Sequence, residues 1–136
     1  MKRWILLIIL LSLVLLCSLT VAYNTKQDEP KPLSFEEYKK IVGDKNKTIL
    51  AYFHADWCVV CRRMQPTIDK ITKEYGSQLE VLSIDTEFHK AVRDTFEIDG
   101  LPVMIFYKNG SLKWTYVGVI SETELKKKMA YYVNMP

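Results

Sequence analysis

Cysteine and histidine are both scarce in this chain of 136 residues, which contains three cysteines and two histidines. A structural zinc site needs four ligands, drawn mostly from cysteine and histidine. The chain offers a single C-x-x-C pair, Cys58 and Cys61, and only His54 and His89 as histidines. So few possible ligands argue against a structural zinc site, and we expect no metal or other cofactor.

A strong excess of charge is also lacking. The formal net charge is +3, and Lys2 and Arg3 supply two of those charges. Nucleic-acid-binding proteins need a basic stripe or patch, which the near-neutral remainder does not provide. We therefore expect no nucleic-acid partner. The length and an apolar fraction of 49% support one globular domain.

Charged residues are absent from residues 4–22, which follow Lys2 and Arg3. As a helix this stretch would span about 28 Å, close to the ~30 Å hydrocarbon core of a bilayer. Residues 1–22 therefore fit both a cleavable signal peptide and an uncleaved N-terminal membrane anchor. On either interpretation the positive flank stays inside. We expect the remainder to be extracytoplasmic, secreted into the periplasm or held at the outer face of the membrane, with membrane contact through residues 4–22 if uncleaved.

Residues 23–33 are polar, contain Pro30 and Pro32, and are typical of a linker. The globular domain is then expected at residues 34–136, with capping boxes at residues 34–37 and 121–124 that each begin a helix. The hydrophobic pattern predicts helices near residues 34–42, 58–75, 89–96 and 121–132, and strands at 48–54, 81–84, 103–108 and 113–117. Asn109-Gly110 predicts a tight hairpin between the last two strands. This order indicates an α/β fold with a mixed sheet of about four strands and helices on both faces.

The stretch Trp57-Cys58-Val59-Val60-Cys61 is where the sequence indicates chemistry. Two thiols within one helical turn can form and break a disulfide. They follow a predicted strand and begin a predicted helix, and a helix N-terminus stabilises a thiolate. A structural bridge closing so short a loop would contribute only about 2 kcal/mol. We therefore interpret the pair as a redox-active disulfide.

Five sequence features together resemble those of thioredoxin-fold proteins. They are residues 55–61, Pro66, residues 100–102, residues 108–110 and residues 117–118. The resemblance covers about residues 34–133. Around the cysteines the amino-acid sequence is most similar to the C-terminal domain of transmembrane thiol-disulfide interchange reductases, which pass electrons to periplasmic partners.

This resemblance implies roles for individual residues. Cys58, with more exposure, would be the attacking thiolate, and the more buried Cys61 would resolve the mixed disulfide. Pro102 would follow a cis peptide bond beside the cysteines and expose the backbone of Leu101 to an extended substrate. Trp57 would form a lid packed against the dithiol.

Two departures from the family pattern concern proton transfer. Most thioredoxins carry a buried acid six residues before the first cysteine, where this chain has Tyr52, and Val81 replaces the lysine that commonly partners that acid. Losing both avoids leaving one buried charge unpaired. Proton transfer would then use Asp56, His54, Glu80 or water, and we favour Asp56 and His54.

No histidine lies between the two cysteines, unlike in the strongly oxidising relatives. We therefore expect a potential nearer thioredoxin's value of about −270 mV than the oxidase value of about −120 mV. The predicted function is reduction of disulfides in exported proteins, with an upstream membrane thiol reductase as the electron donor. Two alternatives remain: a disulfide oxidase or isomerase on the same fold, and a copper-binding metallochaperone using both cysteines with a nearby histidine or Met104.

Overall fold

The computed structural model describes the backbone of residues 1–24 and 30–136, and the side chains of residues 1–17 and 30–136. The chain forms two compact units, residues 1–31 and residues 32–136. Residues 25–29 of the expected linker lie outside the described residues. The elements are α1 (Lys2–Asn24), α2 (Phe35–Val42), β1 (Thr48–His54), α3 (Val59–Tyr75), a 3-10 turn (Gly76–Gln78), β2 (Glu80–Asp85), α4 (Lys90–Thr95), β3 (Val103–Lys108), β4 (Ser111–Val117) and α5 (Glu122–Asn134).

The N-terminal unit contains the helix α1, which begins at Lys2 and runs through the uncharged stretch. Its described apolar side chains are exposed to the surroundings of the helix. Within residues 1–24 and 30–136, no helix is both long enough and apolar enough to cross a membrane.

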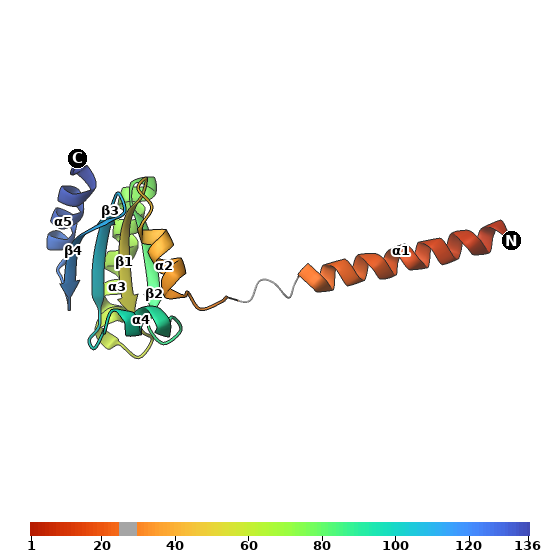
Figure 1. Cartoon of the computed structure of the whole chain (residues 1–136), viewed down its shortest axis with the longest axis horizontal. Coiled ribbons are helices and arrows are strands. Elements are labelled where there is room, and N and C mark those ends of the chain that lie inside the picture. Colours follow the sequence, from red (N-terminus) through yellow and green to blue (C-terminus); the bar gives the residue numbers. More distant parts are fainter. Residues whose placement is uncertain (25–29) are drawn as a thin grey trace. The chain divides into compact units, whose positions relative to one another are not determined.

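The second unit is built on a four-stranded sheet with the order β2-β1-β3-β4, which Figure 1 shows side by side. β1 pairs parallel with β2 and antiparallel with β3, and β3 pairs antiparallel with β4. A parallel pair needs a crossover connection, and α3 supplies it between β1 and β2. The predicted mixed sheet is confirmed. His54 and Asp85 are partners at the carboxyl ends of β1 and β2, and β3 begins at the same edge.

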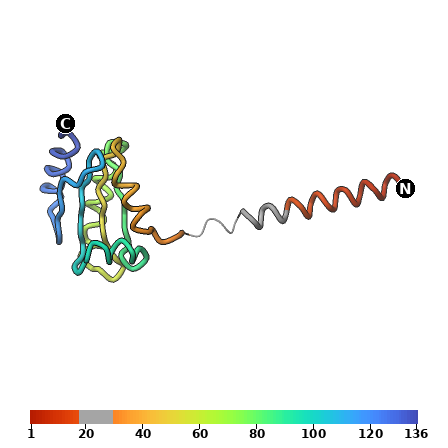
Figure 2. The backbone as a smooth tube through the Cα atoms, viewed as in Figure 1, coloured from red at the N-terminus to blue at the C-terminus, as the bar shows by residue number. Residues whose placement is uncertain are grey.

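Side chains alternate between the two faces of the sheet, so each face has its own core. Leu50 and Tyr52 of β1 pack with apolar residues of α3 and α5. Ile49, Ala51 and Phe53 pack on the other face with residues of α2 and α4. The tube in Figure 2 follows the backbone from α2, α3 and α4 back into the sheet. Helices on both faces are therefore confirmed.

Local signals account for the starts of α2 and α5 and for the turn between β3 and β4. Ser34 and Glu37 form the expected reciprocal capping box at α2, and the Ser121 hydroxyl accepts from the Glu124 amide at 3.2 Å. Asn109 and Gly110 both have positive φ, 54° and 73°, as a two-residue hairpin turn requires. So short a turn leaves residue 111 paired with residue 108. β4 therefore begins two residues earlier than the predicted 113–117.

Candidate active site

The dithiol lies where β1 ends and α3 begins. Cys58 is the N-cap of α3, with extended backbone angles of φ −76° and ψ 99°. Its amide donates to the carbonyl of Ala55 at 3.0 Å, which fixes the turn after β1. Its sulfur accepts from the Cys61 amide at 3.1 Å. The sequence places Cys58 at the positive end of the helix dipole, where a negative sulfur is stabilised.

Cys58 and Cys61 form a disulfide, with 5.2 Å between their Cα atoms. Each cysteine is only 3% exposed. The prediction that Cys58 is more exposed than Cys61 is therefore wrong for this oxidised state. Ala55 and Leu101 pack against both residues, so the bridge and its neighbours shield the two sulfurs together. The two valines between them are exposed instead.

Leu101 and Pro102 reach the cysteines from the start of β3. The peptide bond between them is cis, as expected. Leu101 is half-buried against the disulfide and Ala55. The carbonyl of Pro102 accepts from the amide of Gly118 at 2.8 Å, which ties the loop to the end of β4. The predicted adjacency of this loop to the dithiol is confirmed.

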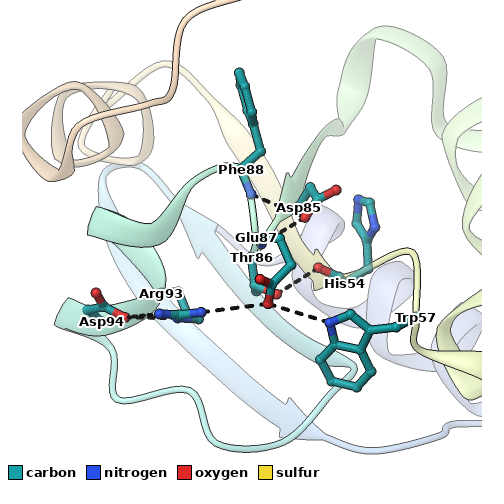
Figure 3. Close-up of polar contacts among 8 residues, drawn as sticks. All are labelled: His54, Trp57, Asp85, Thr86, Glu87, Phe88, Arg93 and Asp94. Atoms are coloured by element: carbon teal, nitrogen blue, oxygen red, sulfur yellow. Dashed lines mark hydrogen bonds and ion pairs between the residues drawn. The ribbon is translucent and has the colours of Figure 1, made fainter.

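Trp57 is 64% exposed and is therefore not a core residue. Its indole N–H donates to Glu87 Oε1 at 3.4 Å, and the same oxygen lies 3.6 Å from the Arg93 guanidinium. Arg93 also pairs with Asp94 at 2.7 Å. Figure 3 shows these contacts as a continuous chain from the indole to α4. Glu87 and Arg93 were not predicted, because neither belongs to a motif and Glu87 lies thirty positions from Trp57 in the sequence.

A groove of about 630 Å³ opens beside Trp57. We call it the Trp57 groove, and its lining residues are Trp57, Thr86, Glu87, Arg93, Asp94, Glu97, Ile98, Asp99 and Leu101. Leu101 packs against the disulfide and Trp57 precedes Cys58 in the chain, so the groove lies near the dithiol, although neither cysteine lines it.

A second, smaller recess of about 360 Å³ adjoins Cys61. We call it the Cys61 recess, and its lining residues are His54, Ala55, Asp56, Cys61, Arg62 and Gln65. His54 Nε2 lies 2.8 Å from the Ser83 hydroxyl on β2. Its ring stacks on that of Tyr52, with 5.4 Å between the ring centroids. Both favoured proton-transfer candidates, His54 and Asp56, therefore line one recess with Cys61.

Comparison with known proteins agrees with this geometry. The sequence profile of the thioredoxin family matches residues 29–131. The chain belongs to the thioredoxin family. Its C-x-x-C pair is the redox-active disulfide of a thiol-disulfide oxidoreductase, and the protein is a thioredoxin-type protein-disulfide reductase.

Among its relatives, a thioredoxin-like protein of Synechocystis is 34% identical over 89 residues, covering 65% of this chain and 82% of the relative. The thioredoxin of Buchnera aphidicola is 30% identical over 97 residues, covering 71% of this chain and 89% of the relative. The oxidised structure of mitochondrial thioredoxin 3 from Saccharomyces cerevisiae superposes with a TM-score of 0.63 at 23% identity. It covers 74% of this chain and 92% of the yeast chain, and it shows the shared fold. These relatives show the family, while the closer likeness to transmembrane reductases stays a prediction.

Tyr52 occupies the position of the buried acid found in most thioredoxins, and it makes a different contact. Its side chain is fully buried, and its hydroxyl donates to the carbonyl of Cys61 at 3.1 Å. Burial raises the pKa of this hydroxyl to about 12, so Tyr52 stays neutral at physiological pH. Val81, at the position of the partner lysine, packs against the same core. An apolar and a neutral polar residue have replaced the charged pair.

Glu80 does not lie near the dithiol. It pairs with Lys47 at 2.8 Å and is the strand partner of Ile49. Ile49 is five residues before His54 in β1, which is roughly 17 Å along a strand. The proposal that Glu80 transfers protons in this thioredoxin is therefore wrong, because it lies at the opposite end of the sheet.

The copper alternative requires a cluster of ligands around the cysteines. In the described part of the chain, no three His, Cys, Asp or Glu side chains gather closely enough to hold a metal ion. Met104 is fully buried in the core, where it is the strand partner of Tyr52. No observation on the described residues favours copper binding over the thioredoxin reaction.

Proposed function

We propose that this thioredoxin-family protein reduces disulfides in exported proteins, with Cys58 attacking and Cys61 resolving. The Cys58 thiolate attacks one sulfur of the substrate disulfide, and the other substrate sulfur leaves as a thiolate and takes a proton. Cys61 then loses its proton and attacks the sulfur of Cys58. The second substrate sulfur leaves, and two electrons and two protons have passed to the substrate.

The position of Cys58 at the start of α3 is the observation that carries this assignment. Its sulfur accepts from the Cys61 amide at 3.1 Å. In the reduced protein the same backbone donor and the helix dipole favour the thiolate, which is the nucleophile in disulfide exchange. Cys61 lies one turn into the helix, where it can reach the sulfur of Cys58 but has no comparable donor of its own at the N-cap.

The export part of the proposal is supported by the sequence of the first unit. Lys2 and Arg3 precede the uncharged residues 4–22, which is the pattern of a signal peptide or an anchor. A reducing dithiol in an oxidising compartment acts repeatedly only if another protein rereduces it. We therefore place a membrane thiol reductase upstream as the donor of electrons.

A trapping experiment with the full chain tests the roles of the two cysteines. Cys61→Ser is expected to accumulate mixed disulfides with partner proteins on non-reducing gels, because nothing then releases Cys58. Cys58→Ser is the matched control and is expected to trap none. The reverse pattern would overturn the assignment, and the trapped partners would show whether they are exported proteins.

The direction of electron flow is tested by equilibrating the purified chain with glutathione buffers. With Cys17 replaced by serine, alkylation of Cys58 and Cys61 reports the reduced fraction at each ratio. A potential near thioredoxin's value of about −270 mV is expected. A value near −120 mV, typical of the oxidases, would contradict the reductase direction.

A further inference from the structure

The Cys61 recess is an opening in the protein surface beside the second cysteine. Cys61 is 3% exposed, and the recess that it lines has a volume of about 360 Å³. This volume exceeds by far the ~30 Å³ that one water molecule occupies in the liquid. A histidine, an aspartate, an arginine and a glutamine are among its lining residues, although most of its exposed lining is apolar. Any proton that leaves the Cys61 thiol can therefore pass into water there.

The group beneath Cys61 cannot take that proton. Tyr52 is fully buried, and its hydroxyl is already donated to the Cys61 carbonyl. Its pKa is raised to about 12, mainly by burial, so it is a neutral donor throughout the physiological range. The usual buried acid is missing, and Tyr52 does not replace its function.

Besides Cys61 itself, three ionisable side chains line the recess, and they are not equivalent. The Arg62 guanidinium donates to the backbone carbonyl of Asp56, and guanidinium does not release its proton in proteins. Carboxyl groups ordinarily hold a proton only below about pH 4, which suits them poorly to accept one from a thiol at neutral pH. Imidazole is the side chain whose ordinary protonation range includes neutral pH. His54 is therefore the best matched of the three.

The contacts of His54 also fix its ring. Nε2 lies 2.8 Å from the Ser83 hydroxyl, and the ring stacks on Tyr52. When Nε2 donates its hydrogen to Ser83, Nδ1 carries the lone pair that can accept a proton. In Figure 3 the imidazole and the Trp57 indole point in different directions from the end of β1. His54 thus lines the recess, and Trp57 lines the Trp57 groove.

We propose that His54 accepts the proton of the Cys61 thiol through water in the Cys61 recess and returns it to solvent. This inference rests on the proposed function, in which Cys61 attacks the mixed disulfide on Cys58. In that step the proton passes from Cys61 to water and from water to Nδ1, the Cys61 thiolate forms a bond to the sulfur of Cys58, and the bond from Cys58 to the substrate breaks. The departing substrate thiolate receives a proton from solvent, so protons and electrons balance.

Several charged or titratable groups surround His54. Asp85 is its strand partner on β2, and Asp56 and Arg62 share the recess. Beyond Asp85 lies His89, at the start of α4. Burial is the main cause that lowers the pKa of His89, with a smaller lowering from charge on His54 and an opposing effect of Asp85. A pH profile of the proposed step must therefore be compared between variants rather than assigned from one curve.

The test uses the reduced full chain carrying Cys17→Ser, which leaves Cys58 and Cys61 as the two thiols of the sequence. The reagent is the aromatic disulfide 5,5′-dithiobis(2-nitrobenzoate), mixed in a stopped-flow instrument. Attack by Cys58 releases one thionitrobenzoate, and attack by Cys61 on the mixed disulfide releases the second. At saturating reagent, the second release is first-order and independent of reagent concentration. The two phases thus separate the two cysteines in one sample, and the first phase reports whether a variant has folded correctly.

His54→Gln is expected to slow the second phase at pH 7 by about a hundredfold, the low end of what general acid–base catalysis contributes. The first phase should change less than about twofold. The rise of the second phase through the neutral range should also disappear, leaving only the rise due to thiol ionisation at higher pH. Added imidazole should restore the second phase of His54→Ala, since the recess is large enough to admit it, and should not affect the unsubstituted protein.

Two control variants separate this role from structural effects. Asp56→Asn removes the carboxyl that lines the recess and should slow the second phase less than His54→Gln does. Ser83→Ala should also slow it less than His54→Gln, because the ring then loses its anchor. Equal slowing of both phases by His54→Gln, an unchanged second phase, or a larger effect of Asp56→Asn would overturn the proposal. A second phase that persists in Cys61→Ser would instead overturn the proposed function.

Discussion

The Trp57 groove and the Cys61 recess both adjoin the disulfide, yet they share no lining residue. The groove is lined by the exposed indole, the loop after β2, and α4 with the loop that follows it. The recess is lined by the end of β1 and the first turns of α3. We therefore propose that a polypeptide and a proton reach the dithiol from separate sides. A substitution in the groove should then change substrate binding without changing proton transfer. A substitution in the recess should change proton transfer without changing substrate binding.

This separation arises in a segment of five residues. His54 ends β1 on the same face as Tyr52, which directs it toward α3. Trp57, three residues later, has left the strand and donates to Glu87 beyond β2. Cys58 follows as the N-cap of α3. In the turn between β1 and α3, the His54 side chain thus lies on the side of the recess and the Trp57 side chain on the side of the groove.

Restoring the usual acid should have the largest effect, on the recess side. Tyr52→Asp would bury a carboxylate beside Val81, which offers no charge, and it removes a hydroxyl bonded to Cys61. We expect the free energy of unfolding at pH 7 to fall by about 3–5 kcal/mol, as for other unpaired buried charges. Urea unfolding measures this loss. Tyr52→Phe, which loses only the hydrogen bond, should cost about 1 kcal/mol.

The free energy of unfolding of Tyr52→Asp should depend on pH, in a direction set by burial of the new carboxyl group. Burial raises the pKa of a carboxyl in the folded state above its unfolded value of about 3.9. The folded state then holds the proton more tightly, so stability falls as pH rises from about 4 through the raised pKa and levels off above it. Adding Val81→Lys should recover part of the loss. A variant equally stable at pH 4 and pH 8 would contradict the burial argument.

The next effect in size is expected on the groove side. Trp57 is 64% exposed beside Cys58, and exposed aromatic side chains are frequent energetic anchors in interfaces. Trp57→Ala should raise the KM for a protein disulfide about tenfold, equivalent to about 1.4 kcal/mol of lost binding. Insulin reduction at varied substrate concentration measures it. Trp57→Phe should retain more of the affinity, and an effect as large on dithiothreitol oxidation would show a general defect instead.

Glu87→Gln should affect the same groove more weakly. The Glu87 carboxylate holds the indole N–H and the Arg93 guanidinium at once. Exposed charged contacts of this kind contribute roughly 0–1 kcal/mol, so we expect KM to rise about twofold. The release of thionitrobenzoate by Cys61 should not change. If that second phase slows while KM stays constant, the two sides of the dithiol are not independent.

Much of the fold was predictable because its signals are local. The capping residue Ser34 and the Asn109-Gly110 turn act within a few residues of themselves, and both hold in the structure. The site was predictable where the family resemblance supplied it, as for Cys58 and the cis bond before Pro102. These features need no knowledge of distant contacts.

Contacts between distant segments were not predictable. Glu87 meets Trp57 only because the loop after β2 lies beside the start of α3. Glu80 was misplaced because the sequence does not show the register of β1 against β2, which pairs it with Ile49 rather than with His54. The equal burial of the two cysteines likewise depends on Leu101, which approaches from β3.

The smallest effect is expected from Glu80→Gln, far from both the groove and the recess. The pair of Lys47 and Glu80 is exposed, at 43% and 44% of the side chains, so its loss should change stability little. Hydrogen bonding and charge attraction by Glu80 raise the pKa of Lys47 above its ordinary 10.5, so what the pair contributes is present below that pH and is lost as pH rises through the raised value. Both thionitrobenzoate phases should match those of the unsubstituted protein. A slower second phase would mean that Glu80 takes part in proton transfer after all. A residue at one end of the sheet would then affect the dithiol at the other end.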